Sequence, residues 1–189
     1  MKIVEREFGP ATMKLETGRM AKQANGSVLV TYGDTVVLVA ATAAKGSGTG
    51  ADFFPLSVFY VEKAYAAGRI PGGFLKREAR LSDSETLISR IIDRPLRPAF
   101  EDNYLAETMI AATVLSHDLI HPSDVAAMNG ASAALAISDI PFHNPLGGVR
   151  VGSIDGKFVT NPSPEQLEVS ELNIFMAASK DAILMVEVE

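Results

Sequence analysis

Residues 27–42 read SVLVTYGDTVVLVAAT, and this stretch decides the fold class of the N-terminal half. It contains two β-branched runs, Ser27 to Tyr32 and Val36 to Thr42, joined by Gly33-Asp34. Valine and threonine favour the pleated strand, and a Gly/Asp pair tolerates the backbone angles of a tight turn. The stretch therefore predicts a β-hairpin.

Strands and helices alternate on both sides of this hairpin. Met13 and Leu15 alternate with polar neighbours, which indicates a strand before the hairpin. Apolar or β-branched runs predict further strands at residues 55–62, 108–115, 149–154, 157–160, 172–178 and 182–188. Helical spacing or N-capping serines predict helices that begin near residues 82, 123 and 163. This order of elements is typical of an α+β fold in which helices pack against a mixed sheet.

The composition is that of one globular domain. Of the 189 residues, 47% are hydrophobic and 21% are charged, which excludes a disordered chain, and no apolar run approaches the roughly 20 residues of a membrane span. The N-terminus lacks the apolar core of an export signal. The absence of cysteine excludes disulfides and Cys-ligated zinc and fits a reducing compartment. We therefore expect a cytoplasmic protein with no membrane partner.

Charge is distributed unevenly along an acidic chain. The net charge is −6, yet the window from Lys63 to Phe100 holds eight Lys or Arg residues and four Asp or Glu residues. This window indicates a local anion site, because the electrostatic field depends on where charges lie rather than on their sum. The alternative is a solvated helix face.

A long irregular segment, residues 63–81, precedes a helix with a clear start signal. Ser82 and Glu85 have the spacing of a capping box. The apolar residues at helical spacing are expected to form the buried face of this helix: Leu87, Ile88, Ile91 and Ile92. Pro95 and Pro98 are expected to end it.

Residues 72–80, GGFLKREAR, carry the strongest functional signal. Phe74 supplies a ring for base stacking, and Lys76, Arg77 and Arg80 supply cations. Cationic phosphate contacts combined with aromatic stacking hold single-stranded nucleic acid without reading its sequence. The segment is therefore a candidate binding site for single-stranded nucleic acid.

Three arginines farther along the chain are candidates to extend that surface: Arg90, Arg94 and Arg97. The alternative reading is structural. In that reading Phe74 is a core side chain, and the arginines pair with nearby carboxylates: Glu78, Asp83 and Asp93. Physical reasoning from the residues leaves both readings open.

Two other patterns are weak indicators of chemistry. Residues 46–50, GSGTG, lack the Lys-Ser/Thr of a P-loop and precede no helix, so we expect a plain connection. His117 and His121 have the spacing of a helical zinc site, but Pro122 disfavours a helix at His121 and no third ligand is near. Composition and spacing therefore identify no catalytic residue.

Several blocks resemble the first core of bacterial polynucleotide phosphorylase, within the ribonuclease PH family. The most specific are residues 65–74 (YAAGRIPGGF) and 84–98 (SETLISRIIDRPLRP). Shorter blocks agree with them: residues 15–24 (LETGRMAKQA), 52–56 (DFFPL) and 129–135 (NGASAAL). The resemblance covers essentially the whole chain and implies an α+β, ribonuclease PH-like two-layer fold.

What the resemblance implies for function is a phosphorolytic exoribonuclease. Members degrade RNA from the 3′ end with phosphate as the nucleophile and release nucleoside diphosphates. Each member has two ribonuclease PH-like cores, and three chains form a ring around a channel. Residues 1–189 are then expected to be a C-terminally incomplete first core that lacks the second core and the RNA-binding domains. Magnesium or manganese and inorganic phosphate would be bound by the second core, and none by this chain.

In the family, a Phe-Phe-Arg-Arg loop grips RNA at the channel entrance. The matching residues here are Phe74-Leu75-Lys76-Arg77, so one ring and one guanidinium are replaced. Arg94 and Arg97 are expected to support the neighbouring active core. The partners implied are single-stranded RNA, two further copies in a homotrimer, and an RNA-degradation complex.

The resemblance also implies that this core is catalytically silent. Where the active core has serines that hold phosphate, Ser123-Asp124 stands here, and an aspartate repels that anion. Where the active core has an Asp-x-Lys pair for metal binding and catalysis, Asn173-Ile174-Phe175 stands here. Two alternatives remain. One is a stand-alone RNA-binding or scaffold module, and the other is a single-core phosphorolytic enzyme like ribonuclease PH.

Overall fold

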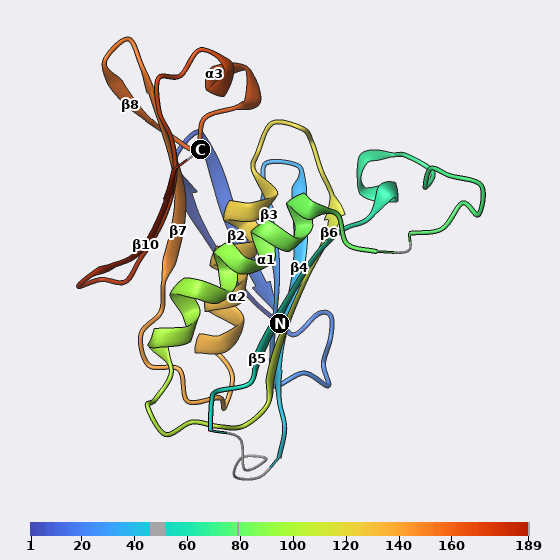
Figure 1. Ribbon diagram of the computed structural model, residues 1–189, viewed down its shortest axis with the longest axis vertical. Helices are drawn as coiled ribbons and strands as arrows, with labels where there is room; N and C mark the ends of the chain where they lie inside the picture. Colours follow the sequence, from blue (N-terminus) through green and yellow to red (C-terminus); the bar gives the residue numbers. More distant parts are fainter. Residues whose placement is uncertain (46–51, 79, 189) are drawn as a thin grey trace.

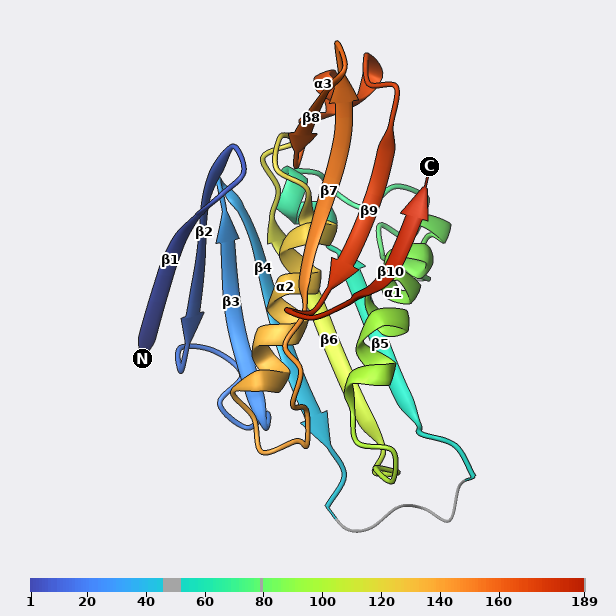
Figure 2. The ribbon, with the colours of Figure 1, turned by 90° about the vertical axis from the view of Figure 1, so that its left-hand side faces the viewer.

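The strands form two sheets with the longer helices between them (Figures 1 and 2). The computed structural model describes residues 1–45, 52–78 and 80–188, so the Gly/Ser/Thr connection at residues 46–50 lies outside the described residues. Six strands form the first sheet: β1 (Lys2–Phe8), β2 (Ala11–Thr17), β3 (Gly26–Tyr32), β4 (Thr35–Ala43), β5 (Leu56–Glu62) and β6 (Thr108–Ser116). Their order is β1-β2-β3-β4-β6-β5, with β5 and β6 parallel and the other neighbours antiparallel. The predicted α+β class with a mixed sheet is confirmed.

The hairpin predicted from residues 27–42 is present as β3 and β4. Gly33 has a φ of +59° in its turn, and a Cβ at this position would lie 2.1 Å from His121 Nδ1. Both the turn and the close packing therefore require glycine. Val30 and Val37 pair directly across the two strands and are fully buried. The hairpin thus supplies the centre of the sheet and part of the core.

The C-terminal strands form a separate antiparallel sheet that the sequence did not distinguish from the first. Its order is β10-β9-β7-β8, and its strands are β7 (Gly147–Ile154), β8 (Lys157–Thr160), β9 (Asn173–Ala178) and β10 (Ile183–Val188). Asp155 and Gly156 join β7 to β8 with φ angles of +50° and +72°, which confirms the second predicted hairpin. Figure 2 shows β7 and β9 lying over the helices.

Helix α2 (Ser123–Ala136) lies in the centre of the molecule and contacts β3, β4 and β7. Its small residues allow this close packing. A Cβ on Gly130 would lie within 2.7 Å of both Val39 Cγ2 and Val30 Cγ2, so the helix rests directly on the hairpin. The short helix α3 (Pro164–Glu168) begins at the predicted capping box of Ser163 and Gln166. Within the described residues, no helix combines the length and the apolar character needed to cross a membrane.

Helix α1 (Asp83–Leu96) starts as predicted, and Ile91 and Ile92 are buried as expected, but the buried face also carries polar residues. Ser82 Oγ accepts a hydrogen bond from Glu85 N, and the Glu85 carboxylate accepts one from Ser82 N. Leu87, predicted to be buried, is 57% exposed. Glu85 and Ser89 are buried instead, because they accept hydrogen bonds from backbone N–H groups of Glu62 and Tyr60 in β5. Polar side chains of the helix therefore accept hydrogen bonds from backbone N–H groups at the edge of the sheet formed by β5.

Helix α1 ends between the two prolines that were expected to end it, one residue after Pro95 and before Pro98. Pro95 is buried inside the helix, which continues to Leu96 and passes into a 3₁₀ turn, η2 (Arg97–Ala99). Proline is tolerated there because only the carbonyl of Ile91 loses a backbone donor, and Arg97 N still bonds to Asp93 O.

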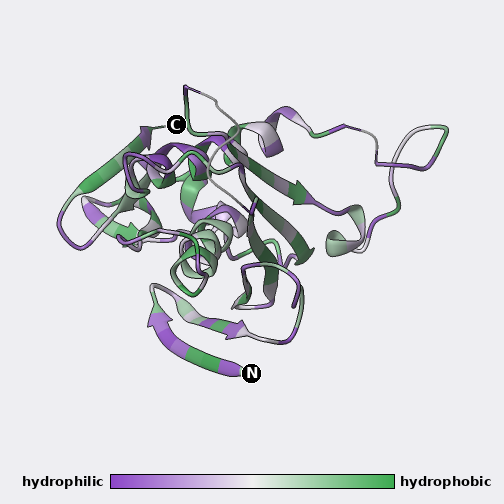
Figure 3. Cartoon of the chain, turned by 90° about the horizontal axis from the view of Figure 1, so that it is seen from below, coloured by the Kyte–Doolittle hydropathy of each residue, from purple (hydrophilic) through white to green (hydrophobic). Residues whose placement is uncertain are grey.

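Strand β1 is the element that the sequence reading did not predict. It pairs antiparallel with β2, and all of its residues except Phe8 are exposed. Figure 3 shows hydrophilic and hydrophobic residues mixed along this N-terminal strand. With little of it buried, its sequence KIVEREF has no clear two-residue hydrophobic period.

Candidate nucleic-acid interface

The segment between β5 and α1 projects from the body of the molecule (Figure 1). It begins with a 3₁₀ turn, η1 (Ala64–Ala67), and a hydrogen bond of 3.0 Å from His117 N to Ala66 O ties this turn to the end of β6. Gly68 ends the turn with a φ of +66°. The described residues of the rest of the segment, 69–78 and 80–81, form no helix or strand, as predicted, and most of their side chains are exposed.

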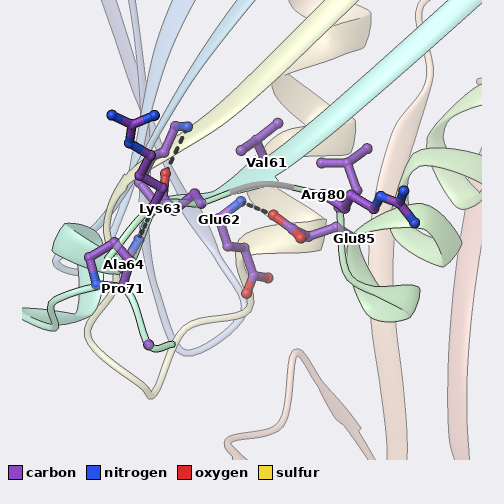
Figure 4. A pocket seen from close by; sticks show the side chains of 11 residues that line it. Val61, Glu62, Lys63, Ala64, Pro71, Arg80 and Glu85 are labelled. Atoms are coloured by element: carbon purple, nitrogen blue, oxygen red, sulfur yellow. Dashed lines mark hydrogen bonds and ion pairs between the residues drawn. The ribbon is translucent and has the colours of Figure 1, made fainter. Parts of the chain in front are cut away.

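A pocket of about 560 Å³ lies at the base of this loop. Its walls come from the end of β5, the loop and the start of α1, and they include Glu62, Lys63, Arg77, Arg80 and Glu85. In the view of Figure 4, Glu85 lies between Lys63 and Arg80. Burial alone would raise the pKa of Glu85, but hydrogen bonds from the backbone of Ser82 and Glu62 outweigh it and lower that pKa. Glu85 is therefore a charged structural acceptor.

The cations of the loop are exposed and free of carboxylates. Within residues 52–78 and 80–188, neither Lys76, Arg77 nor Arg80 makes an ion pair or a side-chain hydrogen bond. The nearby carboxylate of Glu78 is used by Lys63, whose Nζ donates to Glu78 Oε2 at 3.0 Å. The structural alternative, in which Glu78 neutralises these arginines, is therefore excluded. The three cations remain available to a polyanion.

The aromatic residue of the loop is not part of the core. Phe74 is 98% exposed, and Leu75 beside it is 74% exposed. Tyr65, in the turn η1, is 58% exposed and adds a second ring near the base of the loop, which the sequence reading did not select. Exposed rings beside unpaired cations have the chemistry of a base-stacking surface.

Arg94 and Arg97 lie at the other end of α1. They are separated from Ser82 by most of a helix that is roughly 20 Å long at 1.5 Å per residue. Arg94 Nη1 lies 3.4 Å from Glu187 Oε2 in β10, and the arginine is otherwise exposed. The six predicted RNA-binding residues therefore fall into two groups rather than one continuous surface.

Arg97 fastens the end of α1 to the start of β5. Its guanidinium pairs with Asp93, at 2.8 Å, and donates to the carbonyl oxygens of Phe54, at 2.8 Å, and Leu56, at 3.1 Å. It also lies over the ring of Phe54. This pairing agrees with the structural alternative for Arg97, because most of its donors are already used.

A second charged cluster forms where the start of α2 meets β7 and β9. Arg150 Nη2 donates to Asp124 Oδ2 and Arg150 Nη1 donates to Asn173 Oδ1, each at 2.7 Å. The side chains of Arg150 and Asp124 are 11% and 8% exposed. The guanidinium also lies 6.0 Å from the centre of the Phe175 ring. The residues matched above to the phosphate and metal positions of an active core do converge in space.

These residues do not fit phosphate or a metal ion. Phosphate would have to displace Asp124 from a buried ion pair while facing the same carboxylate. For a divalent metal, the cluster offers one carboxylate, already paired, and one amide. Among the described residues, no three or more His, Asp or Glu side chains form a group that could hold a metal ion. We derive no chemical step at this cluster.

Sequence reasoning missed Arg150 and also Tyr60. The fully buried Tyr60 hydroxyl donates to Glu62 Oε1 at 2.7 Å and shares a hydrogen bond of 2.8 Å with Ser123 Oγ. Burial raises the pKa of Tyr60 well above its usual value, so the phenol stays neutral. Asp124 lies 26 residues from Arg150 in the sequence, and Ser123 lies 63 residues from Tyr60, whose other partner, Glu62, is two residues away. Local spacing therefore connects neither Arg150 nor Tyr60 with the start of α2.

His121 is held by a carboxylate. Its Nδ1 lies 2.6 Å from Asp118 Oδ2, and Asp118 also accepts backbone hydrogen bonds from Asp34, Ile120 and His121. Burial alone would raise the pKa of Asp118, but the donors from His121, Ile120 and Asp34 hold it well below its usual range. This cluster joins the β3–β4 turn to the start of α2, which is a structural role.

The comparison with known protein families gives the class of protein. Residues 11–141 match the 3′ exoribonuclease family, domain 1, and residues 144–189 match domain 2 of the same family. The chain belongs to the 3′ exoribonuclease family. The division between the two matches falls just before β7, where the chain leaves the first sheet and the two longer helices and enters the second sheet.

Comparison with individual proteins identifies the relatives more narrowly than the family match does. The chain is 57% identical over 184 residues to the polyribonucleotide nucleotidyltransferase of Geotalea uraniireducens, and 59% identical over 184 residues to that of Geobacter sulfurreducens. Each alignment covers 97% of this chain and 26% of the relative, so the chain spans about a quarter of the length of these relatives. The resemblance to the first core of bacterial polynucleotide phosphorylase is confirmed.

Solved structures share the fold at low sequence identity. An archaeal exosome core gives a TM-score of 0.68 at 17% identity, and rice Rrp46 gives 0.75 at 14% identity. These matches cover 98% and 97% of this chain, and 76% and 81% of the other chains. They confirm the ribonuclease PH-like fold.

Proposed function

We propose that this chain is the RNA-binding core of a phosphate-dependent 3′-to-5′ exoribonuclease that degrades mRNA to nucleoside diphosphates. The observation that carries the proposal is the projecting loop, where Lys76, Arg77 and Arg80 are exposed without carboxylate partners beside the exposed ring of Phe74. Phosphate groups would contact the cations, and a base would stack on the ring. The relatives' name, polyribonucleotide nucleotidyltransferase, is consistent with this chemistry.

We further propose that this core is catalytically silent. The buried pair of Arg150 and Asp124 neutralises itself, and Asn173 and Phe175 supply neither a carboxylate nor an amine. Inorganic phosphate and magnesium or manganese would be held by a second core beyond residues 1–189, with this chain as the first core domain. Arg94 would support that active core, and Arg97 would do so through the position it gives to the end of α1.

The remaining parts of the proposal concern assembly. The working form would be a homotrimer in the cytoplasm that threads single-stranded RNA past the loops of three copies. An RNA-degradation complex would be a further partner. The projection of the loop away from both sheets supports this arrangement, because its tip can reach a strand without involving the packed core (Figure 1).

RNA binding tests the first part. A triple variant, Lys76→Ala with Arg77→Ala and Arg80→Ala, should bind single-stranded RNA more weakly, and the slope of log affinity against log salt should fall by about 2, at roughly 0.7 per lost contact. The matched control removes three exposed lysines elsewhere: Lys22→Ala, Lys157→Ala and Lys180→Ala. Equal losses in both triple variants would mean that only net charge matters and would contradict a site at the loop.

Product release tests the second part. The chain should release no nucleoside diphosphate from single-stranded RNA in the presence of phosphate and magnesium, whereas the full-length relative from Geobacter sulfurreducens should. Diphosphate release by the chain itself would overturn catalytic silence and favour a single-core phosphorolytic enzyme. RNA binding by the chain without activity in any longer form of the protein would favour a scaffold module.

A further inference from the structure

Among the described residues of the range 69–81, only the side chain of Glu78 forms hydrogen bonds with the body of the molecule. Glu78 Oε1 accepts a hydrogen bond from Ala64 N at 2.6 Å, and Glu78 Oε2 accepts one from Lys63 Nζ at 3.0 Å. Both partners follow directly after β5, so the carboxylate joins the two ends of the projecting loop. These hydrogen bonds, with Ala64 N first and Lys63 second, lower the pKa of Glu78.

The tip of the loop has little else to hold it. Among the described residues, residues 70–77 make no backbone or side-chain hydrogen bond to the body of the molecule. Ile70 and Phe74 are 79% and 98% exposed, so apolar packing does not fix the tip either. The position of Arg77 and Arg80 relative to the body therefore depends on the carboxylate that lies between them in the sequence.

We propose that Glu78 is a positioning residue for RNA binding: it clamps the base of the loop so that the adjacent arginines project together towards the phosphates of the RNA. This inference rests on the proposed RNA-binding function. It also explains how an acidic residue is accommodated in a cationic site. Because Lys63 and the Ala64 N–H use both carboxylate oxygens, Glu78 does not neutralise Arg77 or Arg80.

The direction in which Glu78→Ala changes RNA affinity distinguishes a positioning role from a purely electrostatic one. Removing a negative charge beside an RNA site strengthens binding if charge alone matters. If Glu78 is the clamp, Glu78→Ala weakens binding to a single-stranded oligoribonucleotide despite the more favourable charge. We expect a loss of about tenfold at low salt, comparable to misplacing one or two phosphate contacts. Glu78→Gln, which keeps one acceptor oxygen for Ala64 N, should fall between the wild type and the alanine variant.

Asp83→Ala is the matched control. Asp83 lies five residues away, is exposed, and makes no ion pair or side-chain hydrogen bond among the described residues. Its removal changes the net charge by the same amount without touching the clamp, so RNA binding should be unchanged or slightly tighter. If Glu78→Ala also binds as tightly as the wild type or more tightly, the clamp is wrong.

A double-mutant cycle of Lys63 and Glu78 tests the same contact. Lys63→Ala should weaken binding because it leaves the Glu78 carboxylate free to face the arginines, and the double variant with Glu78→Ala should bind no more weakly than Glu78→Ala alone. Additive losses would mean that Lys63 contacts RNA independently and would count against the clamp.

Amide hydrogen exchange in the absence of RNA keeps this inference separate from the proposed function. In Glu78→Ala, the Ala64 N–H should exchange faster, while the α1 amides stay protected. Faster exchange with weaker RNA binding supports the clamp, and unchanged exchange at Ala64 overturns it. If the wild type fails to bind RNA although Ala64 exchange does accelerate, the proposed function has failed, the positioning role falls with it, and only the structural contact survives.

Discussion

Two regions that contain arginine differ in whether the arginine side chains are paired with carboxylates. In the projecting loop, Arg77 and Arg80 are exposed, and Glu78, which lies between them in the sequence, pairs with Lys63. At the junction of α2, β7 and β9, Arg150 is buried and donates to Asp124 and Asn173. The first region leaves its cations for an external anion, whereas the second supplies the anion itself.

This difference shows that the count of basic residues does not locate an anion site. A guanidinium that is already paired in a dry environment gives little to an incoming phosphate, because the new contact must replace an existing one. An exposed guanidinium keeps its donors towards solvent and can exchange counterions for RNA. Variants of the buried region should therefore change mainly the unfolding free energy, and variants of the loop should change mainly RNA affinity.

The largest effect on stability is expected at Arg150. Arg150→Met leaves Asp124 charged and unpaired in a buried site, which should cost about 3–5 kcal/mol of unfolding free energy. Affinity for single-stranded RNA, measured under conditions where the variant is folded, should not change. Urea unfolding followed by circular dichroism measures the first quantity and fluorescence anisotropy the second.

The matched control for Arg150 removes both charges. Arg150→Met combined with Asp124→Leu should be more stable than Arg150→Met alone, because no buried charge remains without a partner. A loss of RNA affinity in the folded single variant would break the comparison, since it would place Arg150 in the binding site.

A smaller loss of stability is expected at Asp118, together with a change in pH dependence. Because its pKa is lowered in the folded state, the carboxylate contributes stability that is present above the usual Asp range and is lost as the pH falls through the lowered value. Asp118→Asn should cost about 2–3 kcal/mol at neutral pH, the scale of hydrogen bonds to a charged group. It should also flatten the decline of stability in acid. Urea unfolding measured at neutral pH and then down through the acid range below the usual Asp pKa tests both predictions, and an acid decline as steep as that of the wild type would assign it to other carboxylates.

Arg97 and Arg94 should differ although they lie three residues apart. Arg97→Ala removes donors from Phe54 O and Leu56 O and should cost about 1–2 kcal/mol. Arg94→Ala breaks one exposed contact with Glu187 and should cost less than about 0.5 kcal/mol. Thermal unfolding of both variants measures the contrast. Equal stability would show that the Arg97 contacts are not formed in solution, which would return Arg97 to the RNA-binding candidates on equal terms with Arg94.

Sequence patterns predicted the elements whose signals are local. The β3–β4 hairpin, the capping box of Ser82 and Glu85, and the Asp155-Gly156 turn were all found where the residues placed them. These features depend on neighbours within a few positions, so a single sequence contains them. The loop cations were selected from a local pattern as well, and their role in RNA binding stays a prediction; that they make no ion pair within the described residues became visible only in the structure.

The failures have non-local causes. Leu87 was expected to be buried from spacing alone, but the face of α1 that meets β5 carries acceptors for the N–H groups of Tyr60 and Glu62. Arg150 was not selected because its partners come from other elements. The separate second sheet was missed because strand propensity does not say which strands pair.

The smallest effect on stability is expected at the tip of the loop, where the effect on RNA binding should be clearest. Phe74→Ala removes a side chain that is 98% exposed, so the unfolding free energy should change by less than about 0.5 kcal/mol. RNA affinity should fall by about 1–3 kcal/mol, the usual contribution of one stacked base. Leu75→Phe gives the reverse test, because a second exposed ring beside Phe74 should tighten binding with equally little effect on folding. Anisotropy titrations of the two variants against the same oligoribonucleotide would decide the matter: unchanged affinity in both would leave the loop with cations alone, and the stacking half of the proposed interface would be wrong.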